Sequence, residues 1–202
     1  METAAVDVRA AIADERRELA DVLDGLTARQ WDAPTLCDGW RVREVAAHMS
    51  MGFRYSLGRT ALEFARAGGK LHRMTDRIAR RDAVALTPRE LATALRDNVQ
   101  HPWRPPMGGL AAALGHDVIH GLDITVALGI GRQVPLERLR IVLGTVKPST
   151  LRFFRANLGD VELRATDLEW SYGTGTRVAR PAQELLLLAY GRGLPAGRGS
   201  RS

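Results

Sequence analysis

The chain has 202 residues, of which 45% are hydrophobic and 26% are charged, a composition typical of soluble proteins that bury a core. No run approaches the roughly 18 consecutive apolar residues that a membrane-spanning helix needs, and a single cysteine, Cys37, excludes an internal disulfide. The net charge is +6, but nearly all basic residues are arginines that we interpret as scattered along the chain, without a nucleic-acid-binding motif, so we expect no nucleic-acid partner.

The N-terminal residues and the single cysteine indicate the cellular compartment of the protein. The first residues are acidic and polar, unlike a secretory signal, and a single cysteine suits a reducing cytosol. We therefore expect a cytoplasmic protein without a membrane partner.

Apolar residues recur at helical spacing in the first third of the chain. Residues 4–26 predict one helix, and residues 27–40, rich in helix breakers, predict a loop. A second helix is expected over 41–67, ended by Gly68 and Gly69.

Further helices are expected in the middle of the chain. Residues 72–85 are compatible with a helix, and Thr87 to Glu90 form a capping box with Pro88 at the first helical position. A long apolar helix is predicted over 110–128, and another from Pro135 to about 157.

After Gly159 the pattern changes to short alternating segments. Residues 161–166, 168–172 and 177–179 predict strands, and 181–190 predict a short apolar helix. The sequence thus predicts a mainly α fold. It would consist of a four-helix bundle over 1–158, a small C-terminal α/β region of short strands plus one helix over 159–194, and a flexible tail over 195–202.

Three histidines could meet inside such a bundle. His116 and His120 are four residues apart on the predicted long helix, so both side chains point to one side. His48 lies in the second helix among small apolar neighbours. Together they could hold a divalent metal with positions left open, and Asp123 could orient one imidazole from behind. The alternative is that these are core histidines bonded to backbone carbonyls; for His72 and His101 we expect simple exposure.

Three segments carry a family resemblance. Residues 31–48, WDAPTLCDGWRVREVAAH, look like the N-terminal signature of mycothiol-dependent maleylpyruvate isomerase-like proteins, part of the DinB-like superfamily of four-helix-bundle metalloenzymes. Residues 115–124, GHDVIHGLDI, resemble the second metal-binding helix of that superfamily. The stretch from Leu163 to Arg192 is similar to the small C-terminal region of the same proteins.

The resemblance implies a DinB-like bundle with metal ligands that carry over to His48, His116 and His120. The isomerase branch usually has glutamate where this chain has His116, whereas an all-histidine triad is typical of the wider superfamily. Zinc is the metal expected first, with nickel, cobalt or iron as alternatives. Mycothiol is the implied thiol cosubstrate.

The implied chemistry begins with the mycothiol sulfur at an open metal position, where thiolate is favoured over thiol. Its addition to a small electrophilic substrate gives either cis–trans isomerisation after elimination or S-transfer. Arg192 is the candidate catalytic residue, as a group that holds a carboxylate of substrate or thiol. The arginines at 73, 77, 80 and 81 are a second candidate for that role, although a solvated helix face explains them better.

Other interpretations stay open. The second possible function is a non-catalytic stress protein that binds a metal at the same histidines but turns over no substrate. The third is a basic nucleic-acid-binding module. Cys37 is interpreted as a small packed residue rather than a nucleophile, and Trp31 and Trp40 as residues that pack the loop over the bundle. The expected partners are a small-molecule substrate and a low-molecular-weight thiol, with a homodimer left open.

Overall fold

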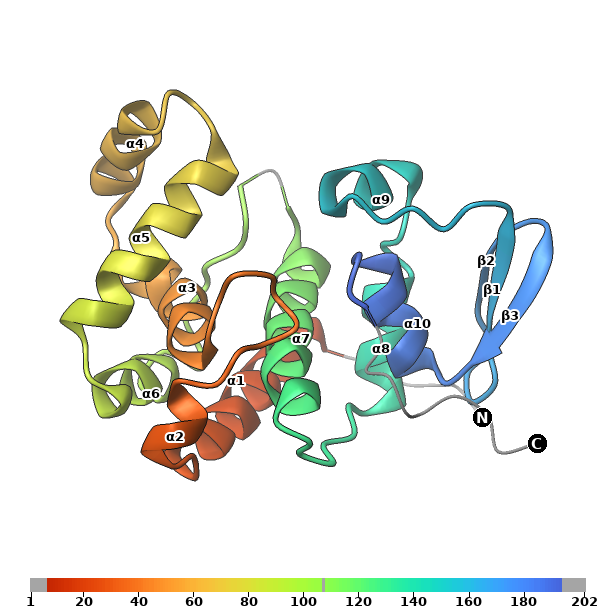
Figure 1. The fold of residues 1–202 in the computed structure, drawn as a ribbon, viewed down its shortest axis with the longest axis horizontal. Coiled ribbons are helices and arrows are strands. Elements are labelled where there is room, and N and C mark those ends of the chain that lie inside the picture. Colours follow the sequence, from red (N-terminus) through yellow and green to blue (C-terminus); the bar gives the residue numbers. More distant parts are fainter. Residues whose placement is uncertain (1–6, 107, 194–202) are drawn as a thin grey trace.

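A computed structural model describes residues 7–106 and 108–193 of the chain (Figure 1). The helices are α1 (Val8–Asp24), α2 (Ala28–Trp31), α3 (Val42–Arg54), α4 (Leu57–Arg66), α5 (Leu71–Ala85), α6 (Pro88–Arg96), α7 (Leu110–Ala127), α8 (Leu136–Leu143), α9 (Pro148–Phe154) and α10 (Ala182–Ala189). The strands are β1 (Val161–Ala165), β2 (Ser171–Gly173) and β3 (Thr176–Arg180). None of the helices in this described part is long and apolar enough to cross a membrane.

Four helices form a closed ring. α1 packs against α6 and α7, and α3 packs against the same two helices, so each member has two neighbours; α5 covers the outer side of α3. The predicted fold class, a mainly helical bundle with a small C-terminal α/β part, is confirmed.

Two predicted long helices are each divided in two, which corrects the expectations for 41–67 and 135–157. The first breaks at Tyr55, whose backbone is extended, and Ser56 then caps α4 by accepting from the Arg59 backbone N–H. The second ends at Gly144, and α9 begins only at Pro148, after an extended Lys147. In each case a local cap or proline overrides the helical periodicity.

The loop expected over 27–40 contains the short helix α2. Thr27 and Gln30 cap it reciprocally: the Thr27 side chain accepts from the Gln30 backbone N–H, and the Gln30 side chain accepts from the Thr27 backbone N–H. This capping box was missed because it stands before only one turn of helix.

The C-terminal strands form one sheet in the order β2–β1–β3. β1 pairs antiparallel with β2 and parallel with β3, so the turn at Gly173–Gly175 joins two strands that flank β1 rather than pair with each other. α10 packs on α7, α8 and β1, and one apolar core contains residues of α1, α7, α8, β1 and α10. The proposed domain boundary at 158/159 stays a prediction, and the predicted tail, 195–202, lies outside the described residues.

Candidate metal centre

The structure brings together the three histidines that the sequence singled out. His48 comes from the middle of α3, and His116 and His120 lie one turn apart on α7, which packs against α3. One ring nitrogen from each lies within 4.8 Å of the other two. His48 Nε2 and His116 Nε2 are 3.2 Å apart.

His116 is oriented by a buried ion pair. A carboxylate can only accept, so His116 Nδ1–H donates to Asp117 Oδ1 over 2.9 Å, and in the neutral ring this tautomer has its lone pair at Nε2. Asp117 Oδ2 accepts from Arg16 Nε over 2.8 Å, and both side chains of this pair are fully buried. Neither Asp117 nor Arg16 was singled out from the sequence, because Arg16 stands in a Glu-Arg-Arg run of α1 that reads as a solvated face.

His120 is held in the same way by the aspartate that the sequence analysis named. His120 Nδ1–H donates to Asp123 Oδ2 over 3.0 Å. Arg192 Nε and Nη2 each donate to Asp123 over 2.8 Å, and Arg192 Nη1 donates to the Tyr190 carbonyl. Burial raises the pKa of Asp123, but the donors from Arg192 and His120 outweigh it, so its pKa is lowered and it stays ionised.

Arg192 therefore lies directly behind the centre. Three of its five N–H groups are bound to Asp123 and Tyr190, and the other two have no partner among the described residues. Its direct role is to fix the carboxylate that orients His120.

The imidazoles of His48 and His120 are kept neutral. Burial, together with the neighbouring His120 and His116, lowers the pKa of His48 well below its usual value. Burial also lowers the pKa of His120, despite the Asp123 carboxylate. His48 Nδ1 is buried and has no hydrogen-bond partner within the described residues. Neutral imidazole is the form that binds a metal.

The spacing of His48 Nε2 and His116 Nε2 fits two ligands of one divalent cation. Two nitrogens about 2.05 Å from a shared ion lie about 3.1 Å apart when the angle at the ion is about 100°, near tetrahedral. The observed separation of His48 Nε2 from His116 Nε2 is 3.2 Å. Two facing acceptor lone pairs at that distance repel each other unless a proton or a cation lies between them.

Two tryptophans cover the histidines. The Trp40 ring centroid lies 5.1 Å from that of His48, and Trp40 Nε1–H donates to Asp76 on α5. The Trp103 centroid lies 5.0 Å from that of His116. Trp103 packs so closely on α3 that a Cβ on Gly52 would lie 2.4 Å from its ring. Trp103 was missed in the sequence because its segment is rich in proline and has no helical pattern.

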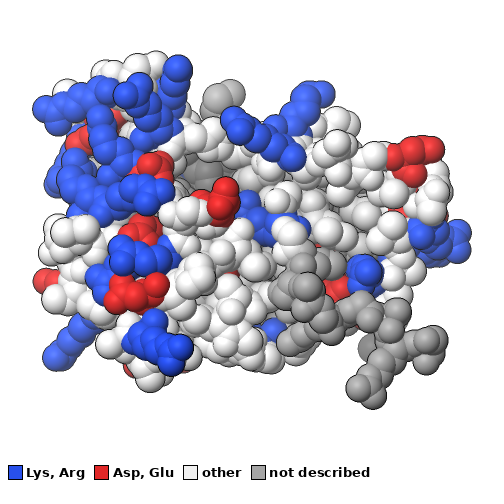
Figure 2. All heavy atoms as spheres, viewed as in Figure 1, with Lys and Arg blue, Asp and Glu red and all other residues white. Residues whose placement is uncertain are grey.

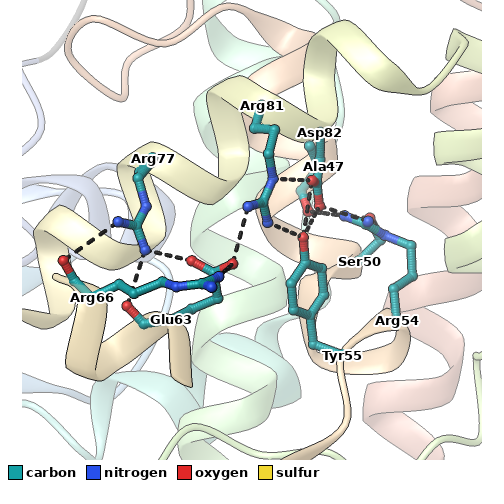
Figure 3. Close-up of polar contacts among 9 residues, drawn as sticks. All are labelled: Ala47, Ser50, Arg54, Tyr55, Glu63, Arg66, Arg77, Arg81 and Asp82. Carbon is teal, nitrogen blue, oxygen red and sulfur yellow. Dashed lines mark hydrogen bonds and ion pairs between the residues drawn. The ribbon is translucent and has the colours of Figure 1, made fainter. Parts of the chain in front are cut away.

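The arginines of α5 mostly contact other parts of the chain rather than the histidines. Arg77 and Arg81 bind Glu63 of α4, as Figure 3 shows. Arg80 binds Asp76 and the Gly39 carbonyl, so it holds the loop that carries Trp40. Arg73 is exposed. These contacts support a structural role for three of the four arginines.

The remaining candidates lie as follows. Burial, reinforced by Asp123, raises the pKa of Cys37 to about 11, which makes it an unreactive thiol near neutral pH. Trp31 and Trp40 are buried in the core beside α3. His72 is exposed, as expected, but His101 is half-buried, because its carbonyl accepts from Arg16 and its Nδ1 accepts from the Trp103 N–H.

Fold and site together define a helical-bundle protein with a candidate three-histidine centre. Residues 12–105 match the family described as mycothiol maleylpyruvate isomerase N-terminal domain. Two solved structures share the fold. The mycothiol-dependent maleylpyruvate isomerase aligns with a TM-score of 0.62 and 14% identity over 94% of this chain and 91% of that chain. A histidine-to-alanine mutant of mycothiol-dependent maleylpyruvate isomerase aligns with a TM-score of 0.59 and 14% identity over 93% and 90%.

The predicted resemblance is thus confirmed for the family and for the fold. No curated protein sequence matches the chain.

Proposed function

We propose that this protein is a metal-dependent and mycothiol-dependent enzyme that isomerises or S-conjugates a small electrophile. The observation that carries the proposal is the convergence of three imidazole nitrogens, two of them oriented by Asp–Arg pairs, in the fold of a mycothiol-dependent isomerase. His48, His116 and His120 would hold the ion, and zinc is the first choice among zinc, nickel, cobalt and iron.

The charges around the centre favour an anionic ligand. The three histidines would bind in their neutral form, and Asp117 and Asp123 are each neutralised by an arginine, Arg16 and Arg192. A divalent cation held there would keep its full charge and stabilise a thiolate relative to a thiol. Arg192 would use its two remaining N–H groups to bind a carboxylate of the thiol or of the substrate.

A cobalt-reconstituted protein tests thiol binding directly. Addition of mycothiol should produce a thiolate-to-cobalt charge-transfer absorption, and the reconstituted protein should then isomerise maleylpyruvate or consume mycothiol with an added electrophile. His48→Ala should abolish both signals. His72→Ala removes an exposed histidine outside the triad and is the matched control, which should keep both.

The outcomes separate the alternatives. Metal binding without a thiol signal or turnover would favour the non-catalytic metal-binding protein. Turnover that persists in metal-free His48→Ala would contradict the mechanism.

A further inference from the structure

In helix α4 the usual arrangement is reversed: large apolar side chains are exposed and a charged side chain is buried. Leu57, Ala61 and Phe64 follow one another at helical spacing along one side, and Leu62 projects from a different side, about 140° around the helix from Leu57. Leu57 is 90% exposed, Leu62 50% and Phe64 41%. We call the exposed surface of these three large side chains the α4 face. Helix α4 itself lies at the outer corner of the molecule, far from the sheet (Figure 1).

The inward side of α4 is polar. Glu63, the helix's buried residue, is 3% exposed and projects about 100–120° around the helix from each of these three side chains. It accepts from Arg77 and Arg81 of α5, and Arg66 lies 3.7 Å away (Figure 3). Ion pairs of Glu63 therefore hold α4 on α5, together with Ala67 at the end of α4, which packs with Met74 and Ile78 of α5. The three exposed side chains belong to none of the apolar cores of the described residues. Exposed large apolar side chains on such a helix favour an interaction in which they insert into a partner or a membrane surface.

Basic residues surround the α4 face. Residues 54–82 contain eight basic and three acidic residues, so arginine is not evenly scattered, which corrects the expectation from composition. Of the acids, Glu63 and Asp82 are buried, and Asp76 is paired with Arg80. Figure 2 shows the Lys and Arg side chains gathered over the corner where Figure 1 places α4 and α5.

We propose that the α4 face, with Arg59, Arg66 and Lys70 beside it, docks onto an anionic membrane surface. An amphipathic helix that exposes leucine and phenylalanine above basic flanks is the arrangement that lies in the interface of anionic lipids. The proposal departs from the sequence-based expectation of no membrane partner, and it does not depend on the proposed function.

Two other occupants fit less well. A second copy docking through the same face would bring two arginine-rich rims together, and like charges repel. A stable protein partner typically covers about 800 Å² per side, whereas three large apolar side chains on one protruding ten-residue helix offer a small convex surface.

Sedimentation of the full-length protein with vesicles tests the proposal. Binding is expected to vesicles of mixed phosphatidylglycerol and phosphatidylcholine, to be weak with phosphatidylcholine alone, and to decrease when NaCl rises from about 0.05 to about 0.5 M. The double variant Leu57→Ser/Phe64→Ser should lower the partition coefficient at least about tenfold, because it removes the inserted side chains. Leu136→Ser, on the exposed side of α8, should leave it unchanged.

A second pair of variants tests the charges. Arg59→Gln/Arg66→Gln should weaken binding to the anionic vesicles and flatten its salt dependence, whereas Arg29→Gln/Arg89→Gln, two exposed arginines of α2 and α6, should not. Circular dichroism verifies that each variant is folded. The proposal is overturned if the protein does not bind anionic vesicles. It is also overturned if the serine variant binds as well as the wild type, because binding would then depend on charge and not on the apolar side chains. Dimerisation that the serine variant abolishes, without vesicle binding, would assign the face to a second copy instead.

Discussion

Each histidine of α7 donates a proton from Nδ1 to an aspartate that is itself paired with an arginine. The pairs Asp117–Arg16 and Asp123–Arg192 join α7 to α1 and to the residues after α10, so the orientation of two imidazoles depends on distant parts of the chain. Such outer partners fix the tautomer and raise the basicity of the ligand nitrogen. His48 has no such partner at Nδ1 in the described residues; Trp40 and the other two histidines surround it.

Asp117→Asn tests this support for His116. The variant removes the carboxylate that His116 and Arg16 share, and metal affinity should fall about 10- to 100-fold in competition with a chelator. The metal-free protein should lose about 3–5 kcal/mol in urea unfolding, because Arg16 would remain buried without its anion. Asp21→Asn, which removes an exposed carboxylate paired with Arg96, should change neither quantity. Unchanged affinity in Asp117→Asn would remove Asp117 from the site.

At the scale of elements, two loops cover the histidines, and each is held by hydrogen bonds to its backbone groups. The loop before α3 is held by Leu36 N–H donating to the Asp123 carbonyl and by Arg80 donating to the Gly39 carbonyl. The segment before α7 is held by Arg16, which donates to the His101 carbonyl. Arg16 thus supports both the orientation of His116 and the segment that places Trp103 over it.

Gly52→Ala tests how closely that segment fits. The added Cβ would meet the Trp103 ring at 2.4 Å, so Trp103 has to move. We expect a loss of about 1–3 kcal/mol in urea unfolding together with a shift in tryptophan fluorescence. Gly58→Ala, in α4, is the matched control: its Cβ meets nothing within 4 Å, and it should be neutral or stabilise by up to about 1 kcal/mol. Equal effects of the two variants would show that Trp103 does not pack against α3 as described.

In the whole molecule, the candidate centre lies where two apolar cores adjoin. One core gathers residues of α1, α7, α8, α10 and the sheet, and the other gathers residues of α1, α3, α5 and α6 together with Ile124 of α7. Since His48 belongs to α3 and the other two histidines to α7, an ion bound by all three would join the two sides and stabilise the folded chain.

Acid should destabilise the metal-free protein. Burial lowers the pKa of His48 and His120, and also of His101, relative to about 6.5 in the unfolded chain. Below about pH 6.5 these histidines therefore bind protons in the unfolded state but not in the folded state. The free energy of unfolding thus falls as the pH decreases from about 6.5 to about 5, and it is constant above about pH 6.5. The lowered carboxylate pKa values, as at Asp123 and Glu63, act only below about pH 4.5.

Urea unfolding at pH 5, 6, 7 and 8 measures this dependence. His48→Leu removes one of the buried titrating groups, so its unfolding free energy should vary less between pH 5 and 7 than that of the wild type. An identical pH dependence in the two proteins would mean that His48 is protonated in the fold.

Much of the fold was predictable because its signals are local. The capping box at Thr87, the long apolar helix and the spacing of His116 and His120 depend on neighbouring residues only, and the structure has α6 and α7 where they were predicted. The breaks at Ser56 and Pro148 were missed because apolar residues continue at helical spacing on both sides of each break.

The support around the histidines was less predictable. The approach of His48 to the other two depends on how α3 packs on α7, which no local pattern encodes. Arg16 reads as a surface residue until α1 is packed, and its partner Asp117 is 101 residues away. The inverted orientation of α4 likewise depends on Glu63 meeting arginines of another helix.

Metal content tests the central claim most directly. The wild type, His48→Ala and the control His72→Ala would be purified without a histidine tag, reconstituted with zinc, dialysed and measured by elemental mass spectrometry. The three-histidine centre predicts about one ion per chain in the wild type and in His72→Ala, and loss of that ion in His48→Ala. No ion in the wild type after reconstitution with zinc, nickel or cobalt, or full retention in His48→Ala, would contradict the site and, with it, the proposed enzyme.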